Sequence, residues 1–177
     1  MDGEYKKFDR SLYEKYDKLG KEYARQFLPR ILKLSNPEKY KDVQVRDEGE
    51  NYGPDLVCHN NGEVVGYFEV EIKNNWNTKQ FNFPDLQIPE RKAKWANGYK
   101  GKAVTYCVLS KPERSGVTKT CIGNMATVKG SLVSKCPTQY VKTKYTQNEK
   151  FFKIPLNVVH FHDFAEVIEK EQKNGTS

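Results

Sequence analysis

The sequence predicts one α/β domain that spans residues 1–177, with frayed ends at residues 1–3 and about 171–177. Three observations predict this class. The chain opens with an amphipathic helical pattern, continues with two alternating segments joined by an Asn-Gly pair, and then carries a near-continuous apolar run after a second helical segment. Such a run is typical of a strand covered on both faces. We therefore expect a central mixed sheet flanked by helices.

The first helix is expected to begin near Ser11, because Ser11 and Glu14 have the spacing of a capping box. Apolar side chains then recur at three- and four-residue steps and form one stripe. The stripe consists of Leu12, Tyr16, Leu19, Tyr23 and Phe27. Pro29 has no amide N–H, so we expect it to kink or end the helix, with a further short turn after it.

Three strand-like segments follow the helix. Residues 43–45 alternate between apolar and polar, as in a half-buried strand. The next two segments cover residues 55–59 and 63–73, and Asn61-Gly62 between them accepts the positive φ angles of a tight turn. We therefore expect the last two strands to pair antiparallel.

The second half of the chain is expected to complete the sheet. Pro89 suits the first turn of a helix and Asn97-Gly98 suits its end, so a helix is expected over residues 89–97. The apolar run at 103–109 is the strand that we expect at the centre. The C-terminal additions are strands at 118–122, 150–154 and 158–161, a segment at 125–133 that fits a helix or a strand, and a terminal helix at 164–172.

Composition limits the class of function. Aromatic residues make up 12% of the chain, which argues against a disordered protein. No apolar run reaches about 18 residues, and residues 1–10 are too polar for a secretory signal, so we expect no membrane partner and a cytoplasmic setting. The net charge of +7 predicts an acidic partner, most commonly nucleic acid. A basic surface without such a partner is the alternative.

Metal and nucleotide motifs of the familiar kinds are absent from the sequence. The four cysteines have no zinc-type spacing, and Cys58 and Cys107 lie in apolar runs, so buried free thiols are expected. His160 and His162 have no third ligand nearby in the sequence. No G-x-x-x-x-G-K-[ST] or G-x-G-x-x-G loop occurs, so no nucleotide cofactor is expected.

The most informative segment is the strand at 63–73. Alternation along a strand places Glu69, Glu71 and Lys73 on one face, and Asp55 comes from the partner strand across the hairpin. Clustered carboxylates repel one another unless a cation lies between them, and Mg²⁺ prefers oxygen ligands. A bound Mg²⁺ can activate water and polarise a phosphoryl oxygen, while a neighbouring lysine orients that water or stabilises negative charge. A solvated, charged edge strand is the alternative explanation.

Asp55, preceded by proline, and Glu71-Ile72-Lys73 resemble the motif of the PD-(D/E)xK nuclease superfamily. The expected elements over about residues 11–110 resemble its restriction-endonuclease-like αβββαβ core. The resemblance implies Asp55 and Glu71 as metal ligands, the Ile72 backbone carbonyl as a further ligand, and Lys73 as the catalytic lysine. It also implies Mg²⁺ as the cofactor, with Mn²⁺ as a substitute.

Other side chains extend this expected site. Glu69 shares the charged face, so it is a candidate for the metal or phosphate shell, or an ordinary surface acid. Sites of this family often include an acid from the first helix, and Glu22 lies about 100° from the centre of the apolar stripe. An exposed helix acid is the alternative for Glu22. The candidate nucleic-acid-binding residues are Lys79, Gln87, Arg91, Lys92 and Lys94.

We therefore expect a metal-dependent nuclease that hydrolyses phosphodiester bonds, with DNA as the first substrate. It would be an endonuclease of the structure-selective or of the restriction or recombination type. A homodimer would suit cutting of two strands. An RNA endonuclease with the same site and a catalytically inactive nucleic-acid-binding module are the alternatives. The aromatic loop at 74–83 fits either base stacking or core packing.

Overall fold

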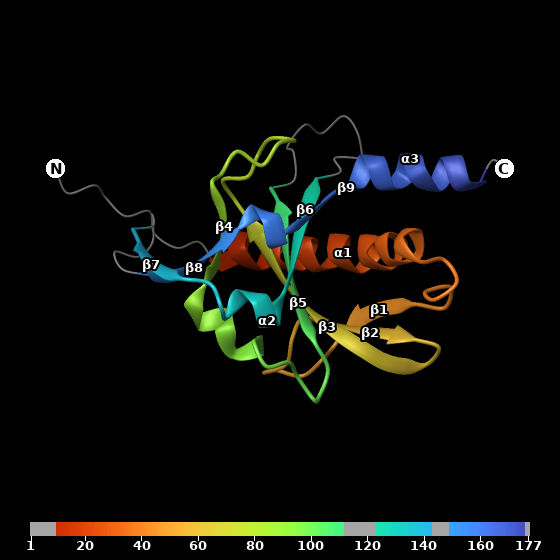
Figure 1. Cartoon of the computed structure of the whole chain (residues 1–177), viewed down its shortest axis with the longest axis horizontal. Helices are drawn as coiled ribbons and strands as arrows, with labels where there is room; N and C mark the ends of the chain where they lie inside the picture. Colours follow the sequence, from red (N-terminus) through yellow and green to blue (C-terminus); the bar gives the residue numbers. More distant parts are fainter. Residues whose placement is uncertain (1–9, 112–122, 143–148, 176–177) are drawn as a thin grey trace.

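The computed structural model describes residues 10–111, 123–142 and 149–175 (Figure 1). It is a mixed α/β protein. In chain order its elements are α1 (Arg10–Ser35), β1 (Gln44–Asp47), β2 (Leu56–Asn60), β3 (Glu63–Lys73), β4 (Asp85–Pro89), the 3₁₀ helix η1 (Glu90–Trp95), β5 (Val104–Ser110), β6 (Asn124–Lys129), α2 (Gly130–Val133), β7 (Thr138–Val141), β8 (Glu149–Pro155), the 3₁₀ helix η2 (Leu156–Val158), β9 (His160–Asp163) and α3 (Phe164–Gly175).

The larger sheet has six strands in the order β1-β2-β3-β5-β6-β9. Neighbours β3 and β5 run parallel, and the other neighbours run antiparallel, so the sheet is mixed as predicted. The β2–β3 hairpin is also confirmed. Its turn has φ angles of 53° at Asn61 and 79° at Gly62, a conformation that Asn and Gly tolerate best.

A second, three-stranded sheet in the order β4-β8-β7 was not expected from the sequence. Residues 85–89 form a strand because Leu86 and Ile88 alternate into the core while Gln87 stays outside it. The expected helix at 89–97 is shorter than predicted and forms η1. The segment at 125–133 divides into strand β6 and the short helix α2.

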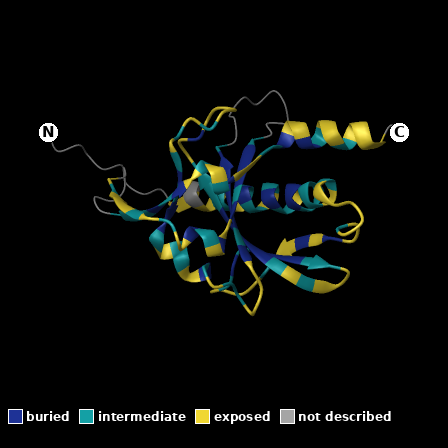
Figure 2. Cartoon of the chain, viewed as in Figure 1, coloured by how far each residue is buried: buried dark blue, intermediate teal, exposed yellow. Residues whose placement is uncertain are grey.

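Apolar side chains pack on both faces of the large sheet, where Figure 2 shows the buried residues concentrated in the central strands. On one face lie α1 and α3, joined by Phe27 and Phe164, whose rings stack with centroids 4.0 Å apart. On the other face lie the small sheet, η1 and α2. Strand β5 contributes to both clusters, with Val108 on one side and Cys107 on the other, which confirms the expected central strand.

Helix α1 continues through Pro29 to Ser35, so the expectation that it could end at the proline was wrong. Tertiary packing explains this, since Phe27 and Leu28 before the proline and Ile31 after it all contact the same cluster. The helix also approaches the sheet closely at Gly20. A Cβ there would lie 3.0 Å from Cγ1 of Ile72, so a larger residue would require the Ile72 side chain to shift.

Three other expectations concern the start of α1, the end of α3 and residues 118–122. Ser11 lies in the first described turn of α1, and Glu14 accepts a hydrogen bond from Nε of Arg10 at 3.0 Å. Helix α3 extends to Gly175 through residues that we expected to be frayed. The strand expected at 118–122 lies outside the described residues.

The remaining expectations concern cysteines, aromatic residues and membranes. Cys58 and Cys107 are buried free thiols, as predicted. In the loop at 74–83, Trp76 is 1% exposed and its ring packs edge-on against Phe81, which favours core packing over base stacking for this pair. None of the helices in the described ranges is long and apolar enough to cross a membrane.

Candidate functional site

The candidate site lies where the pairing between β2 and β3 ends and β3 continues beyond the first residue of β2. The β2–β3 ladder reaches its last pair at Leu56 and Phe68, while β3 runs on to Lys73 beside β5. Asp55 stands just before β2, and its Oδ2 accepts a hydrogen bond of 2.8 Å from the backbone N–H of Val70. The carboxylate thus takes the place of a strand partner and is fixed in position by the backbone of β3.

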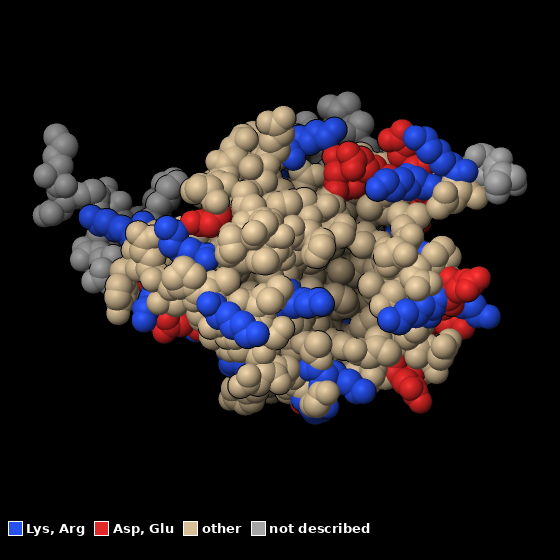
Figure 3. All heavy atoms as spheres, viewed as in Figure 1, with Lys and Arg blue, Asp and Glu red and all other residues tan. Residues whose placement is uncertain are grey.

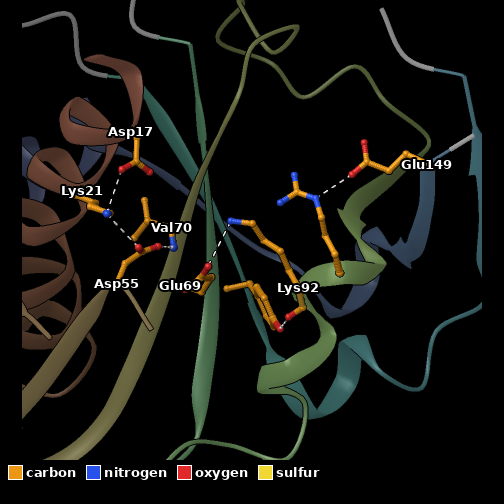
Figure 4. A network of polar contacts seen from close by, with 9 residues as sticks. Asp17, Lys21, Asp55, Glu69, Val70, Lys92 and Glu149 are labelled. Atoms are coloured by element: carbon orange, nitrogen blue, oxygen red, sulfur yellow. Dashed lines mark hydrogen bonds and ion pairs between the residues drawn. The ribbon is translucent and has the colours of Figure 1, made fainter. Parts of the chain in front are cut away.

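Helix α1 supplies a lysine to this carboxylate. Nζ of Lys21 lies 3.2 Å from Oδ1 of Asp55 and 3.0 Å from Oδ2 of Asp17, one turn earlier on the helix (Figure 4). Burial alone would lower the pKa of Lys21, but the charge of Asp55 and the contacts with Asp17 outweigh it and raise the pKa. Lys21 is therefore a firmly charged bridge between α1 and the end of β2.

A second lysine reaches the carboxylates from the opposite side. Nζ of Lys92, on η1, lies 3.3 Å from Oε1 of Glu69, and only 16% and 11% of these two side chains are exposed (Figure 4). The hydroxyl of Tyr106 on β5 donates to the backbone carbonyl of Lys92 and so ties η1 to the large sheet. The ammonium group is thus brought to the face of β3 by a 3₁₀ helix that precedes β5.

The two members of this pair have different electrostatic surroundings. Burial lowers the pKa of Lys92, but the charges of Glu71, Glu69 and Asp55 outweigh it, so its pKa is raised. Burial raises the pKa of Glu69, the negative charge of Asp55 adds to this, and Lys92 offsets it only in part. Lys92 therefore acts as the cation of a cluster with excess negative charge. We call Asp55, Glu69 and Glu71 the acidic cluster.

Lys73 lies at the far end of the same strand face. Its ammonium is 4.4 Å from the centre of the Phe83 ring, and the carboxylates of Glu71 and Asp85 act on it electrostatically. Burial lowers the pKa of Lys73, and these two carboxylates offset the effect only in part. A lysine with a lowered pKa beside carboxylates is a frequent feature of catalytic sites.

The structure therefore brings together most of the residues singled out on β3. Asp55, Glu69 and Glu71 share electrostatic contacts through Lys92, and Glu71 links them to Lys73. Ile72 instead directs its side chain toward α1, against the apolar cluster there. The alternation expected along this strand is thus confirmed.

Glu22 is placed elsewhere. It is exposed on α1, roughly 180° around the helix from the residues that pack on the sheet, Gly20, Ala24 and Phe27. The α1 residues at the site are Asp17 and Lys21, which the sequence analysis did not identify. The apolar stripe of the sequence predicted a different rotation of the helix, because it omitted Gly20 and Ala24, which face the sheet in the structure.

The expected nucleic-acid-binding residues also divide into two groups. Gln87 lies near Lys73 and lines a cavity with it. The other four have these partners: Lys92 pairs with Glu69, Arg91 with Glu149 at 3.0 Å, Lys79 with Asp163 at 3.6 Å, and Lys94 lies 4.7 Å above the Trp95 ring. Arg91, Lys79 and Lys94 are exposed and remain candidates for phosphate contacts. On the face drawn in Figure 3, lysine and arginine side chains are spread over the surface rather than gathered into one patch.

The acidic cluster has the donor chemistry of a magnesium site, since its ligands are carboxylate oxygens. Among the described residues, no three His, Cys, Asp or Glu side chains already surround a single position. Lys21 and Lys92 hold two of the carboxylates, so a divalent ion needs Lys92 to withdraw from the cluster. Burial and the charge of Asp55 both disfavour the ionised form of Glu69, so a divalent ion, with more positive charge than one ammonium, would favour that exchange.

A hollow of about 480 Å³ lies away from this site. It is lined by residues such as Gln44, His59 and Gly62, near the turn of the β2–β3 hairpin. The acidic cluster lies at the opposite end of these strands, where Asp55 and Val70 meet. The candidate site is therefore identified from the chemistry of its side chains and not from the volume of a cavity.

Comparisons with protein-family models, with curated proteins and with solved structures find no match to this chain. The fold and the side chains define a mixed α/β protein with a partly buried acidic cluster at the end of its central strands.

Proposed function

We propose that this protein is a metal-dependent nuclease with a restriction-endonuclease-like core, and that DNA is its substrate. The element order supports the fold assignment. A helix, three antiparallel strands, a helical segment and a strand parallel to β3 occur between α1 and β5 in the αβββαβ order of that core, with β4 inserted between β3 and η1. The elements after β5 are then C-terminal additions.

The observation that carries the proposal is the acidic cluster itself. Burying carboxylates costs free energy, and a chain that only needed stability would place apolar residues there. Here Asp55, at the start of β2, lies beside Glu69 and Glu71 of β3, the strand that also carries Lys73. Such charge clustering at the end of central strands is typical of a site that handles a cation and a charged substrate.

The residues have distinct roles in this proposal. Asp55 and Glu71 hold a divalent ion, with the Ile72 carbonyl as a further ligand, and Glu69 adds negative charge beside them. The bound ion supplies an activated water and a counter-charge for a phosphate oxygen. Lys73, whose pKa burial lowers, can orient the attacking water or stabilise negative charge at the scissile phosphate.

Cleavage assays test the proposal directly. Purified protein is incubated with supercoiled plasmid, branched DNA, single-stranded DNA and RNA, each with Mg²⁺, Mn²⁺ or EDTA. We expect metal-dependent nicking of DNA that is lost in Asp55→Asn and Glu71→Gln. Lys73→Met should lower the rate by about 10²-fold or more while binding persists.

Glu63→Gln is the control for Glu71→Gln, because Glu63 lies on the same strand at its other end, beside the hairpin turn and away from the acidic cluster. This variant should cut DNA at the wild-type rate. Failure of the wild-type protein to cut any of the substrates with either metal would refute the nuclease assignment. Cleavage of RNA alone would replace DNA by RNA as the substrate.

One observation favours a second function, a nucleic-acid-binding module without catalysis. Lys21 and Lys92 already neutralise part of the acidic cluster, so the charged face is held together without a metal ion. This function predicts that the protein binds nucleic acid equally well in EDTA and in Mg²⁺. It also predicts that Asp55→Asn leaves the affinity unchanged and that no substrate is cut.

A further inference from the structure

A cavity of about 180 Å³ lies beside Lys73, at the C-terminal end of β3 and next to the acidic cluster. Its volume equals that of about six water molecules in the liquid, which is large enough for one planar ring system. Lys73 and Phe83 form one side of it, with the ammonium over the ring. The cavity therefore adjoins the expected reaction centre through a shared residue.

The other side of the cavity is the polar face of the small sheet. Leu86 and Ile154 point into the core, so their neighbours along the strands point away from it. On that outer face, Gln87 stands directly opposite Lys153 in the β4–β8 ladder. Gln139 on β7 also lines the cavity.

The lining has two parts that suit different portions of a nucleotide. The Phe83 ring lines the cavity with the Lys73 ammonium over one of its faces, and aromatic side chains of this kind stack on bases. Gln87 and Gln139 each carry an amide that both donates and accepts hydrogen bonds, as the edge of a base does. Lys73 and Lys153 supply positive charge for a phosphate. Asp85, which also lines the cavity, offsets part of this charge and lies with Oδ2 3.6 Å from Nζ of Lys153.

We propose that this cavity takes a single unpaired base of the nucleic acid and so selects nucleotides that lie outside a regular duplex. The proposal rests on the proposed function, since it assumes a nucleic-acid partner. A base pair cannot enter the cavity, because the two strands of a duplex present bases only as stacked pairs. Selection for a flipped, mismatched or single-stranded base next to the acidic cluster would follow from this geometry.

The test measures binding without cleavage. Two labelled DNA duplexes, one fully paired and one with a single unpaired 2-aminopurine, are titrated with the protein in EDTA, and fluorescence anisotropy gives the two dissociation constants. We expect about tenfold tighter binding of the unpaired duplex, the size of one base-stacking contact, together with quenching of the 2-aminopurine fluorescence.

Variants locate the effect. Gln139→Ala and Phe83→Leu should reduce the tenfold preference, and Phe83→Leu should also reduce the quenching. Gln26→Ala, an exposed glutamine of α1 outside the cavity lining, is the matched control and should keep the wild-type preference. Circular dichroism establishes that each variant is folded.

The outcomes separate the two proposals. Equal affinity for both duplexes, or the same preference in Gln139→Ala as in Gln26→Ala, would overturn the base-pocket proposal even if the protein cuts DNA. A preference that depends on Phe83 and Gln139 supports the pocket even if no substrate is cut, in which case only the nuclease assignment fails.

Discussion

Replacing Asp55 separates its structural role from its proposed catalytic role. In Asp55→Ala the N–H of Val70 loses an acceptor at 2.8 Å, and Lys21 loses a partner at 3.2 Å. A hydrogen bond to a charged acceptor contributes about 1.5–3 kcal/mol, whereas a partly exposed ion pair contributes about 0–1 kcal/mol. Relief of the repulsion between Asp55 and Glu69 offsets part of this loss. The expected net cost is about 2–3 kcal/mol.

Asp55→Asn should cost less, about 1 kcal/mol, because the amide oxygen still accepts the N–H of Val70. For a protein of this length each kcal/mol corresponds to about 2–4 °C in Tm. We therefore expect the Tm to fall by about 4–12 °C in Asp55→Ala and by about 2–4 °C in Asp55→Asn. If the nuclease proposal is correct, both variants lose metal-dependent cleavage despite this difference in stability.

Thermal unfolding followed by circular dichroism measures these shifts. Asp47→Ala is the control, since Asp47 is 63% exposed and pairs with Arg25 on the surface. Its free energy of unfolding should change by less than about 0.5 kcal/mol. Equal losses in Asp55→Ala and Asp47→Ala, or in Asp55→Ala and Asp55→Asn, would refute the idea that the carboxylate stabilises the end of β3 by accepting from its backbone.

The remaining predictions concern the pair formed by Glu69 and Lys92. Glu69→Gln should stabilise the fold at pH 7, because burial raises the pKa of Glu69 and the folded state prefers the protonated carboxyl. In the wild type, Glu69 is protonated in both states below its unfolded pKa, near pH 4, and the wild-type protein loses stability as pH rises through the folded pKa. Urea unfolding should therefore show that the stabilities of wild type and Glu69→Gln converge toward pH 4. A stability difference that is constant at all pH values would contradict a raised pKa of Glu69. Lys92→Met should raise the affinity for Mg²⁺ about tenfold, because it removes an ammonium group that competes with the metal ion for Glu69. Titration calorimetry with Mg²⁺ alone measures this affinity, and Lys94→Met is the control. Equal affinities in the two variants would contradict competition between Lys92 and the metal ion.

Much of the local structure could be predicted because it depends on neighbours in the sequence. The turn at Asn61-Gly62 needs residues that accept positive φ, and these two accept it wherever they stand. The two faces of β3 follow from alternation, which places Val70 toward α1 and Glu71 toward the charged side. The buried strand β5 follows from its continuous apolar composition.

Helix rotation and the small sheet could not be predicted in the same way. Gly20 has no side chain to mark the contact face of α1, yet its lack of a Cβ lets the helix approach Ile72. That approach places Lys21 rather than Glu22 at the carboxylates. Strand β4 was missed because its short alternation, with only Leu86 and Ile88 buried, becomes a strand when β8 supplies the hydrogen-bond partners.

That two carboxylates and a lysine lie on one face of β3 could be predicted from the sequence, because the pleat of a strand fixes which side chains share a face. Which cations contact these carboxylates depends on how separate elements pack together. Lys92 is 19 residues beyond Lys73 along the chain, and it reaches Glu69 because Tyr106 and the packing of η1 bring its backbone to the sheet. Electrostatic partners depend on distance in space, and local sequence patterns carry no information about distances between separate elements.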